Sequence, residues 1–214
     1  CRNLALSTMA ENFHKTAYLV LLLSAVFFGV GVANAESRTI SFATYYFEDV
    51  GGGSTIQSVL RGDADERFTR PSARGLSFGW VKNPYWVKLE VLEVLQPQLT
   101  YLDVPWPVLD KLSVYLVGAD RTLLKHYDMG DYRPFSERPV FDANFVVPVD
   151  FSGQNIEAIY FKVETTSSMQ LPLRFWSQAE YFKQRSISLA LEGGFYGLLS
   201  VMIFYNLFIY WSTR

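Results

Sequence analysis

The sequence predicts an all-β domain, a jelly-roll-like antiparallel β-sandwich, preceded by a signal peptide and followed by one transmembrane helix. One observation is a succession of about eight short stretches rich in β-branched and aromatic residues, separated by turn-forming residues. Another is that apolar and polar side chains alternate in these stretches, as they do when antiparallel strands pack one face on a second sheet. Finally, most of the excess apolar sequence lies in two segments, 17–32 and 187–211.

Residues 1–35 are typical of a secretory signal peptide. Lys15 supplies a basic start, 16–32 form an apolar core, and the small residues at 33–35 form a cleavage site. We therefore expect Glu36 to be the first mature residue. The alternative is a retained membrane helix, which the short apolar run disfavours.

The composition excludes several classes of chemistry. The chain has 214 residues and a formal net charge of −2, so there is no electrostatic basis for nucleic-acid binding. Its only cysteine, Cys1, excludes an internal disulfide or a cysteine metal site. It has two histidines, His14 and His126, and we expect no metal and no cofactor. The chain begins with cysteine rather than methionine, and Met9 is an alternative start.

Four strands are expected in the first half of the domain. The stretch 39–47 is rich in β-branched and aromatic residues, and the three glycines that follow indicate a turn. In 85–94 the residues alternate, which places Trp86 and Lys88 on the face opposite the core, where we expect water. The other strands are expected at 76–80 and 98–104, with one helical turn at 56–60 and a polar loop at 61–74.

The second half of the domain continues this pattern. Residues 111–117 alternate and direct Leu112, Val114 and Leu116 inward. A proline, Pro148, indicates an edge strand, because proline cannot donate a hydrogen bond to a neighbouring strand. The remaining strands are expected at 123–127, 144–149, 158–165 and 171–176, with a long loop at 128–142 and a helix at 177–186.

Residues 187–211 are expected to form a transmembrane helix. Glu192 is their only acid or base. A helix of this length extends about 37 Å, and the hydrocarbon core of a bilayer is about 30 Å thick. The flanking residues agree, since charged residues border the segment and aromatic residues lie where the interface is expected: Lys183, Arg185, Arg214, Tyr205, Tyr210 and Trp211.

Five segments of the domain form an ordered set: NPYWVKLEV, VLDKLSVYLV, GDYRPFSERP, a strand ending in VPV, and FKVETTSSMQLPLRFWSQAEY. This set resembles the second type of extracellular domain of bacterial seven-transmembrane receptors with diverse intracellular signalling modules, the 7TMR-DISM family. The terminal segment GGFYGLLSVMIFYNLFIYWSTR resembles the first of the seven membrane helices of that family.

The resemblance implies a domain similar to carbohydrate-binding modules, then seven membrane helices and a cytoplasmic output domain. That output is commonly a diguanylate cyclase or a histidine kinase. Only the first of these helices lies in this sequence, so we expect the chain to be either a fragment or a truncated gene product. The protein is then expected in the bacterial inner membrane, with residues 36–186 in the periplasm.

Two groups of residues are candidates for ligand binding. Trp86 and Lys88 share one strand face, and an aromatic platform with adjacent polar groups suits a sugar. Alternatively, loops cover them and they only pack. In the loop 128–142, Tyr132, Arg133 and Arg138 can grip a carboxylate or a phosphate. The alternative is that the arginines pair with neighbouring acids and fix the loop.

Three further features are read in the same way. Trp106, between two prolines, is either a ligand anchor or a plug at the open end of the sandwich. In the apolar helix, Glu192 either reaches the membrane interface or faces a partner helix. Gly193, Gly194 and Gly197 allow another helix to approach closely, so we expect a packing face there.

These features favour a non-enzymatic sensor of carbohydrate or a related small molecule, linked to the membrane, to downstream helices and to a cytoplasmic signalling domain. Two alternatives stay open. One is a glycan-cleaving enzyme, which requires paired carboxylates about 5–9.5 Å apart in a cleft. The other is a structural module that docks to a partner protein or forms a homodimer.

Overall fold

A computed structural model describes residues 40–72 and 75–213. All described residues belong to one compact unit. The predicted signal peptide and its cleavage site lie outside the described residues.

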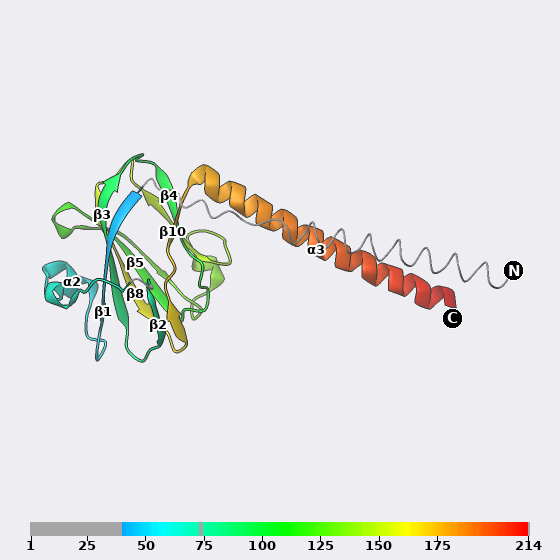
Figure 1. Ribbon diagram of the computed structural model, residues 1–214, viewed down its shortest axis with the longest axis horizontal. Coiled ribbons are helices and arrows are strands. Elements are labelled where there is room, and N and C mark those ends of the chain that lie inside the picture. The colour runs from blue at the N-terminus through cyan, green and yellow to red at the C-terminus, as the bar shows by residue number, and fades with distance from the viewer. Residues whose placement is uncertain (1–39, 73–74, 214) are drawn as a thin grey trace. The chain divides into compact units, whose positions relative to one another are not determined.

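The described chain consists of antiparallel strands followed by one long helix (Figure 1). The strand that the sequence does not predict is β9, which has only three residues and therefore too little pattern to detect. The elements are β1 (Ile40–Glu48), α2 (Ile56–Arg61), η1 (Asp65–Arg67), β2 (Ser77–Trp80), β3 (Tyr85–Val94), β4 (Leu99–Val104), β5 (Lys111–Gly118), η2 (Ala119–Arg121), β6 (Leu123–Met129), η3 (Phe135–Glu137), β7 (Phe145–Asp150), β8 (Ile156–Glu164), β9 (Ser168–Gln170), β10 (Arg174–Ser177) and α3 (Gln178–Thr213).

The strands form three sheets. The largest has the order β1-β3-β8-β5-β6, the second has the order β10-β4-β7, and β2 pairs with β9. All pairs of neighbouring strands are antiparallel. This arrangement confirms the predicted antiparallel β-sandwich. It also confirms the prediction from Pro148, because β7 lies at an edge of the three-stranded sheet.

The main core brings together side chains of the five-stranded and three-stranded sheets. Val114 of β5 and Phe161 of β8 are fully buried. They belong to one cluster with Leu102 of β4 and with Phe145 and Val147 of β7. Burying apolar side chains of this size stabilises a fold by about 1.5–3 kcal/mol each. The inward residues that the alternation predicts in 111–117 all lie in this cluster.

The outer face of the five-stranded sheet carries a second apolar cluster. Trp86 of β3 and Tyr160 of β8 pack there with Ile56 and Val59 of α2. These two α2 residues lie three positions apart, which places them on one side of the helix. The prediction that this face meets water is therefore wrong around Trp86. The sequence pattern of β3 cannot show that a short helix from elsewhere covers it.

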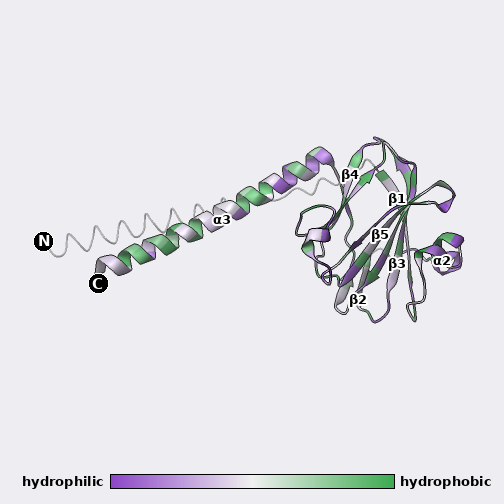
Figure 2. Cartoon of the chain, turned by 180° about the vertical axis from the view of Figure 1, so that it is seen from behind, coloured by the Kyte–Doolittle hydropathy of each residue, from purple (hydrophilic) through white to green (hydrophobic). Residues whose placement is uncertain are grey.

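Helix α3 follows β10 directly. Ser177 and Glu180 cap its start, since both the backbone nitrogen and the hydroxyl of Ser177 donate to Glu180 Oε2, at 3.0 and 2.7 Å. Figure 2 shows hydrophilic residues at the start of α3 and mostly hydrophobic residues further along it. The helix is long and apolar enough to cross a membrane, and its apolar side chains, such as Phe204, are exposed.

Candidate functional site

Two clefts in the described part of the chain are lined by candidate functional residues. The loop cleft has a volume of about 220 Å³ and is lined by Lys82, Asn83, Pro84, Asp110, Lys111, Tyr132, Glu164, Thr165 and Thr166. The helix cleft has a volume of about 170 Å³ and is lined by Asp103, Asp142, Asn144, Val146, Arg174, Trp176, Tyr181, Gln184, Arg185 and Ser188. The loop cleft is built from the ends of strands, whereas the helix cleft lies between the three-stranded sheet and α3.

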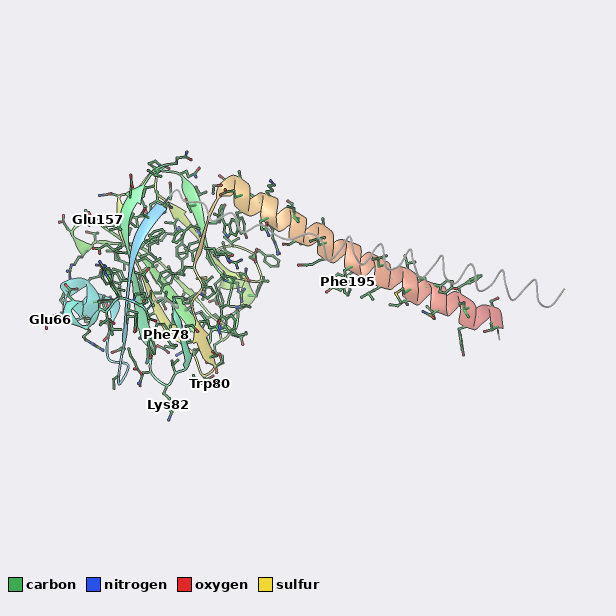
Figure 3. The ribbon with its side chains drawn as sticks, viewed as in Figure 1. Glu66, Phe78, Trp80, Lys82, Glu157 and Phe195 are labelled. Atoms are coloured by element: carbon green, nitrogen blue, oxygen red, sulfur yellow. The ribbon has the colours of Figure 1, made fainter. Side chains whose placement is uncertain are left out.

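The register of the five-stranded sheet brings the residues of the loop cleft together. Tyr85, at the start of β3, pairs with Val163 near the end of β8. On the other side of β8, Lys111, at the start of β5, pairs with Glu164. The segments before β3 and β5 and after β8 therefore meet at one end of the sheet. Lys82 projects from this end in Figure 3.

Asp110 fixes the shape of the loop cleft. Its Oδ2 accepts hydrogen bonds from the backbone nitrogen of Thr166 at 2.7 Å and from its hydroxyl at 2.8 Å. The Asp110 carbonyl accepts a hydrogen bond from the backbone nitrogen of Tyr132 at 3.3 Å. Gly130 passes so close to this carbonyl that a Cβ there would overlap it, and its φ is +141°. These contacts hold the β6–β7 loop against the start of β5.

An ion pair lies in the wall of the loop cleft. Lys111 Nζ is 2.8 Å from Glu164 Oε2, and Lys162 Nζ is 3.3 Å from Glu164 Oε1. The hydrogen bond from Lys111 lowers the pKa of Glu164 below its ordinary value, so this carboxylate is ionised at neutral pH. The described residues contain no cluster of side chains that could hold a metal ion.

Tyr132 supplies the aromatic surface of the loop cleft. Its side chain is 69% exposed. A sugar can stack its C–H face on such a ring while ammonium, amide and hydroxyl groups bind its hydroxyls. The loop cleft offers these groups on Lys82, Asn83 and Thr165. The sequence predicts an aromatic ring with adjacent polar groups at Trp86 and Lys88. In the structure this combination is present around Tyr132 instead.

Trp86 and Lys88 do not line either cleft. Trp86 is 0% exposed and stacks on Tyr115, with 5.9 Å between ring centroids. Lys88 forms an ion pair with Glu90 at 3.4 Å. An open aromatic platform at these two residues is therefore a wrong expectation, and the packing alternative describes Trp86. The physical reason is the covering of this face by the residues of α2 and its neighbours.

The two arginines of the β6–β7 loop have partners within the protein. Arg133 lies 3.3 Å from Glu137 and 3.5 Å from Asp128. Arg138 donates to the carbonyls of Asp142 and Ala143 at 2.9 and 2.8 Å. Its guanidinium also lies over the rings of Phe135 and Phe145, at 4.4 and 4.6 Å from their centroids. These contacts correspond to the alternative in which the arginines fix the loop, and neither arginine lines a cleft.

Trp106 is partly buried against the main core. Its Nε1 donates a hydrogen bond to the carbonyl of Ser168 at 3.2 Å. The ring and its polar atom are therefore both engaged inside the protein, which is the geometry expected of a plug rather than of an open ligand anchor.

The helix cleft joins α3 to the sandwich. The Tyr181 hydroxyl donates to Asp142 Oδ2 at 2.8 Å, and Arg185 Nε lies 3.4 Å from the same oxygen. The ring of Tyr181 stacks on Tyr101 of β4, with 4.6 Å between centroids. The other oxygen of Asp142 accepts from the backbone nitrogen of Asn144 at 3.0 Å. One buried carboxylate thereby fixes the first turns of the helix on the domain.

Further along α3 the predicted packing face has no partner in the described residues. Glu192, Gly193, Gly194 and Gly197 are all exposed. A Cβ at Gly193 or Gly197 would meet no atom within 4 Å. A surface of this kind is free to pack against another helix, and that role stays a prediction.

Sequence reasoning finds Tyr132 but misses most of the other cleft residues. Lys82 and Glu164 are far apart in the sequence, and only the strand order β3-β8-β5 makes their segments neighbours. Asp142 and Tyr181 are likewise separated by 39 positions. The sequence signal for these cleft residues is weak, because it consists of polar residues at the two ends of predicted strands.

The match to known proteins agrees with this architecture. Residues 42–177 match the family described as 7TMR-DISM extracellular 2, which covers most of the sandwich from β1 to the end of β10. A comparison with curated proteins finds no match. The matched region is followed at once by α3, the candidate membrane helix. The chain therefore belongs to the 7TMR-DISM extracellular 2 family, whose members carry the extracellular sensor-type domain of seven-transmembrane receptors.

Proposed function

We propose that this domain senses carbohydrate or a related small molecule in the periplasm by binding it in the loop cleft. The observation that supports this proposal most directly is the exposed ring of Tyr132 beside a cleft with hydroxyl, amide and charged groups. The domain needs no catalytic group for this role. Binding requires only a preformed surface, which the two hydrogen bonds that Asp110 accepts from Thr166 help to provide.

The signal is proposed to pass through α3 to further membrane helices and to a cytoplasmic output domain of the diguanylate cyclase or histidine kinase type. The contacts of Asp142 with Tyr181 and Arg185 support this route, because they join the sandwich to the start of the helix. A ligand can shift the packing of α3 only by as much as its affinity differs between the two states. The protein then acts in the inner membrane, with the sandwich outside the cytoplasm.

The test is a ligand screen on the purified full chain in detergent. We expect at least one member of a panel of mono- and disaccharides to raise the midpoint of thermal unfolding. The substitution Tyr132→Ala should then raise the Kd of that sugar about tenfold, which is the loss of one stacking contact of about 1.4 kcal/mol. A matched control is Phe141→Ala, which removes an exposed ring of the same loop that does not line the cleft.

Two results would contradict the proposal. One is an absence of any shift across the panel, and the other is equal sugar binding by the wild type and Tyr132→Ala. Either result favours the alternative of a structural module that docks to a partner protein or forms a homodimer. Analytical ultracentrifugation of the same sample measures the homodimer directly.

A further inference from the structure

The helix cleft contains a buried carboxylate oxygen without a partner. Asp103 of β4 is only 6% exposed. Its Oδ2 accepts a hydrogen bond from Trp176 Nε1 at 3.4 Å, and the side chain of Asn144 also interacts with the carboxylate. No described residue is placed to donate a hydrogen bond to its Oδ1. Leaving a buried acceptor unsatisfied is costly, because the atom has lost its water without gaining a donor. A donor from outside the protein would satisfy this oxygen.

The charges that line the helix cleft are balanced. Two carboxylates, Asp103 and Asp142, face two guanidinium groups, Arg174 and Arg185. Of these, Asp142 and Arg185 already form an ion pair with each other. Arg174 is exposed and forms no hydrogen bond or ion pair with any described residue. Asp103 and Arg174 interact through their charges, but Asp103 Oδ1 still accepts no hydrogen bond. A ligand with an ammonium and an anionic group can therefore contact both side chains.

Asp103 and Arg174 are neighbours in the sheet. They lie directly opposite each other in the antiparallel pairing of β4 with β10. Side chains at such positions start about 4.5–5.5 Å apart on the same face of the sheet. A ligand that reaches both must therefore carry its two charged groups on a short linker. The cleft volume of about 170 Å³ admits a group of this size but not a large sugar.

The position of the helix cleft along the chain indicates where such a ligand is available. Its wall includes Gln184, Arg185 and Ser188 of α3. The long apolar stretch of the helix begins at Ile187. If α3 crosses a bilayer, these residues lie at the depth of the lipid headgroups, where polar and apolar sequence meet.

We propose that the helix cleft binds a zwitterion that carries a primary ammonium and a phosphate group, with the ammonium on Asp103 and the phosphate on Arg174. Phosphoethanolamine has this chemistry, and it occurs both as a lipid headgroup and as a free molecule. The ammonium provides the donor that Asp103 Oδ1 lacks. The phosphate suits the fork of donors on the guanidinium of Arg174. A bound zwitterion would contact both the sandwich and α3, and so strengthen their junction.

The first experiment uses soluble phosphoethanolamine and isothermal titration calorimetry on the full chain in detergent. Phosphocholine is the matched control ligand, because it has the same charges but three methyl groups in place of the N–H donors. We expect phosphocholine to bind at least about tenfold more weakly, because it cannot donate to Asp103. Equal binding of the two compounds would overturn the proposal, as would an absence of binding by both in solution and in lipid.

Two variants locate the site. Asp103→Asn removes the charge but keeps the shape, and Arg174→Gln removes the charge of an exposed side chain. Each should weaken phosphoethanolamine binding about tenfold, as expected for loss of a charge-assisted hydrogen bond. The control is Glu157→Gln, an exposed acid on β8 that lines neither cleft and is labelled in Figure 3. Unchanged affinity in both cleft variants would place the binding elsewhere and overturn the proposal.

The second experiment distinguishes the two sources of the zwitterion. The full chain is placed in nanodiscs of phosphatidylethanolamine or of phosphatidylcholine, and thermal unfolding is followed by circular dichroism. A higher midpoint in phosphatidylethanolamine that Asp103→Asn abolishes supports a lipid as the ligand. Equal midpoints in the two lipids, together with binding of soluble phosphoethanolamine, support a free zwitterion. These outcomes do not depend on Tyr132 or on the loop cleft.

Discussion

The loop cleft and the helix cleft differ in how their charged groups are satisfied. In the loop cleft, Glu164 has two lysine partners, and Asp110 accepts two hydrogen bonds from Thr166. In the helix cleft, Asp142 is fully engaged, whereas Asp103 keeps one buried oxygen without a donor. The loop cleft is therefore a stable, preformed surface. The helix cleft, by contrast, lacks a hydrogen-bond donor for one buried oxygen.

The two clefts are therefore suited to ligands of different chemistry. A satisfied cleft can exchange water for a polar ligand such as a sugar, because no protein group changes its partner. An unsatisfied buried carboxylate instead favours a ligand that brings a donor and a positive charge. We therefore expect a polar, sugar-like ligand in the loop cleft and a ligand with a positively charged group in the helix cleft.

The largest effect is expected from Gly130→Ala, which breaks the loop cleft. The new Cβ overlaps the backbone of Asp110, and the φ of +141° is strained for any other residue. We expect the free energy of unfolding to fall by about 3 kcal/mol. The measurement is urea unfolding followed by tryptophan fluorescence.

The matched control for this variant is Gly51→Ala. Gly51 also has a positive φ, of +87°, but a Cβ there meets no atom within 4 Å. It should cost only about 1 kcal/mol, from the backbone conformation alone. Equal losses for the two variants would show that the contact with Asp110 does not shape the loop cleft.

A smaller effect is expected from Tyr181→Phe, which weakens the helix cleft. The substitution removes the hydroxyl that donates to Asp142 at 2.8 Å in a buried site. A hydrogen bond to a charged group contributes about 1.5–3 kcal/mol, so we expect a loss of about 2 kcal/mol. Thermal unfolding of the full chain in detergent measures the change. Tyr132→Phe, at an exposed ring, is the control and should change the free energy of unfolding by less than about 0.5 kcal/mol.

The smallest expected effect is the pH dependence of the free energy of unfolding. The contributions of the two clefts to this dependence are expected to have opposite signs. Burial raises the pKa of Asp103 above the ordinary value of 3.8. The folded state then keeps a proton that the unfolded state has released, so the free energy of unfolding falls as the pH rises from 3.8 through the raised pKa. The pKa of Glu164 is lowered from 4.5, mainly by its hydrogen bond from Lys111. The stability from this group is lost as the pH falls from 4.5 through the lowered pKa.

Two variants separate these contributions. Asp103→Asn should remove the loss of stability with rising pH, and Glu164→Gln should remove the loss with falling pH. The measurement is the urea-unfolding free energy of each variant between about pH 3 and pH 7. If both variants change the profile in the same direction, the difference between the clefts is not one of charge satisfaction.

Much of the fold can be predicted from the sequence, because strand alternation is a local property. The stretch 111–117 and the edge strand with Pro148 are found where the pattern indicates. The exposure of Trp86 cannot be predicted in this way. Whether the second face of β3 meets water depends on α2, a six-residue helix whose contacts with the sheet are not local.

The candidate sites are predictable to a smaller extent. Tyr132 is recognisable from its loop, but its partners Asp110, Lys82 and Glu164 come from three other segments. The role of Asp142 depends on a helix that begins 36 positions later, at Gln178. Long-range contacts of this kind follow from the order of strands in the sheets, and a single sequence does not contain that order.

The strand pattern, the apolar helix α3 and the family can be recognised from the sequence alone, because each depends on residues that lie close together in the chain. Three features become visible only in the folded protein: Trp86 is buried, Tyr132 borders a polar cleft, and Asp103 lies at the junction with α3 with one oxygen that lacks a donor. The physical reason is that burial and hydrogen-bond satisfaction are properties of neighbours in space. Antiparallel pairing and the packing of α2 and α3 bring those neighbours together from distant parts of the chain.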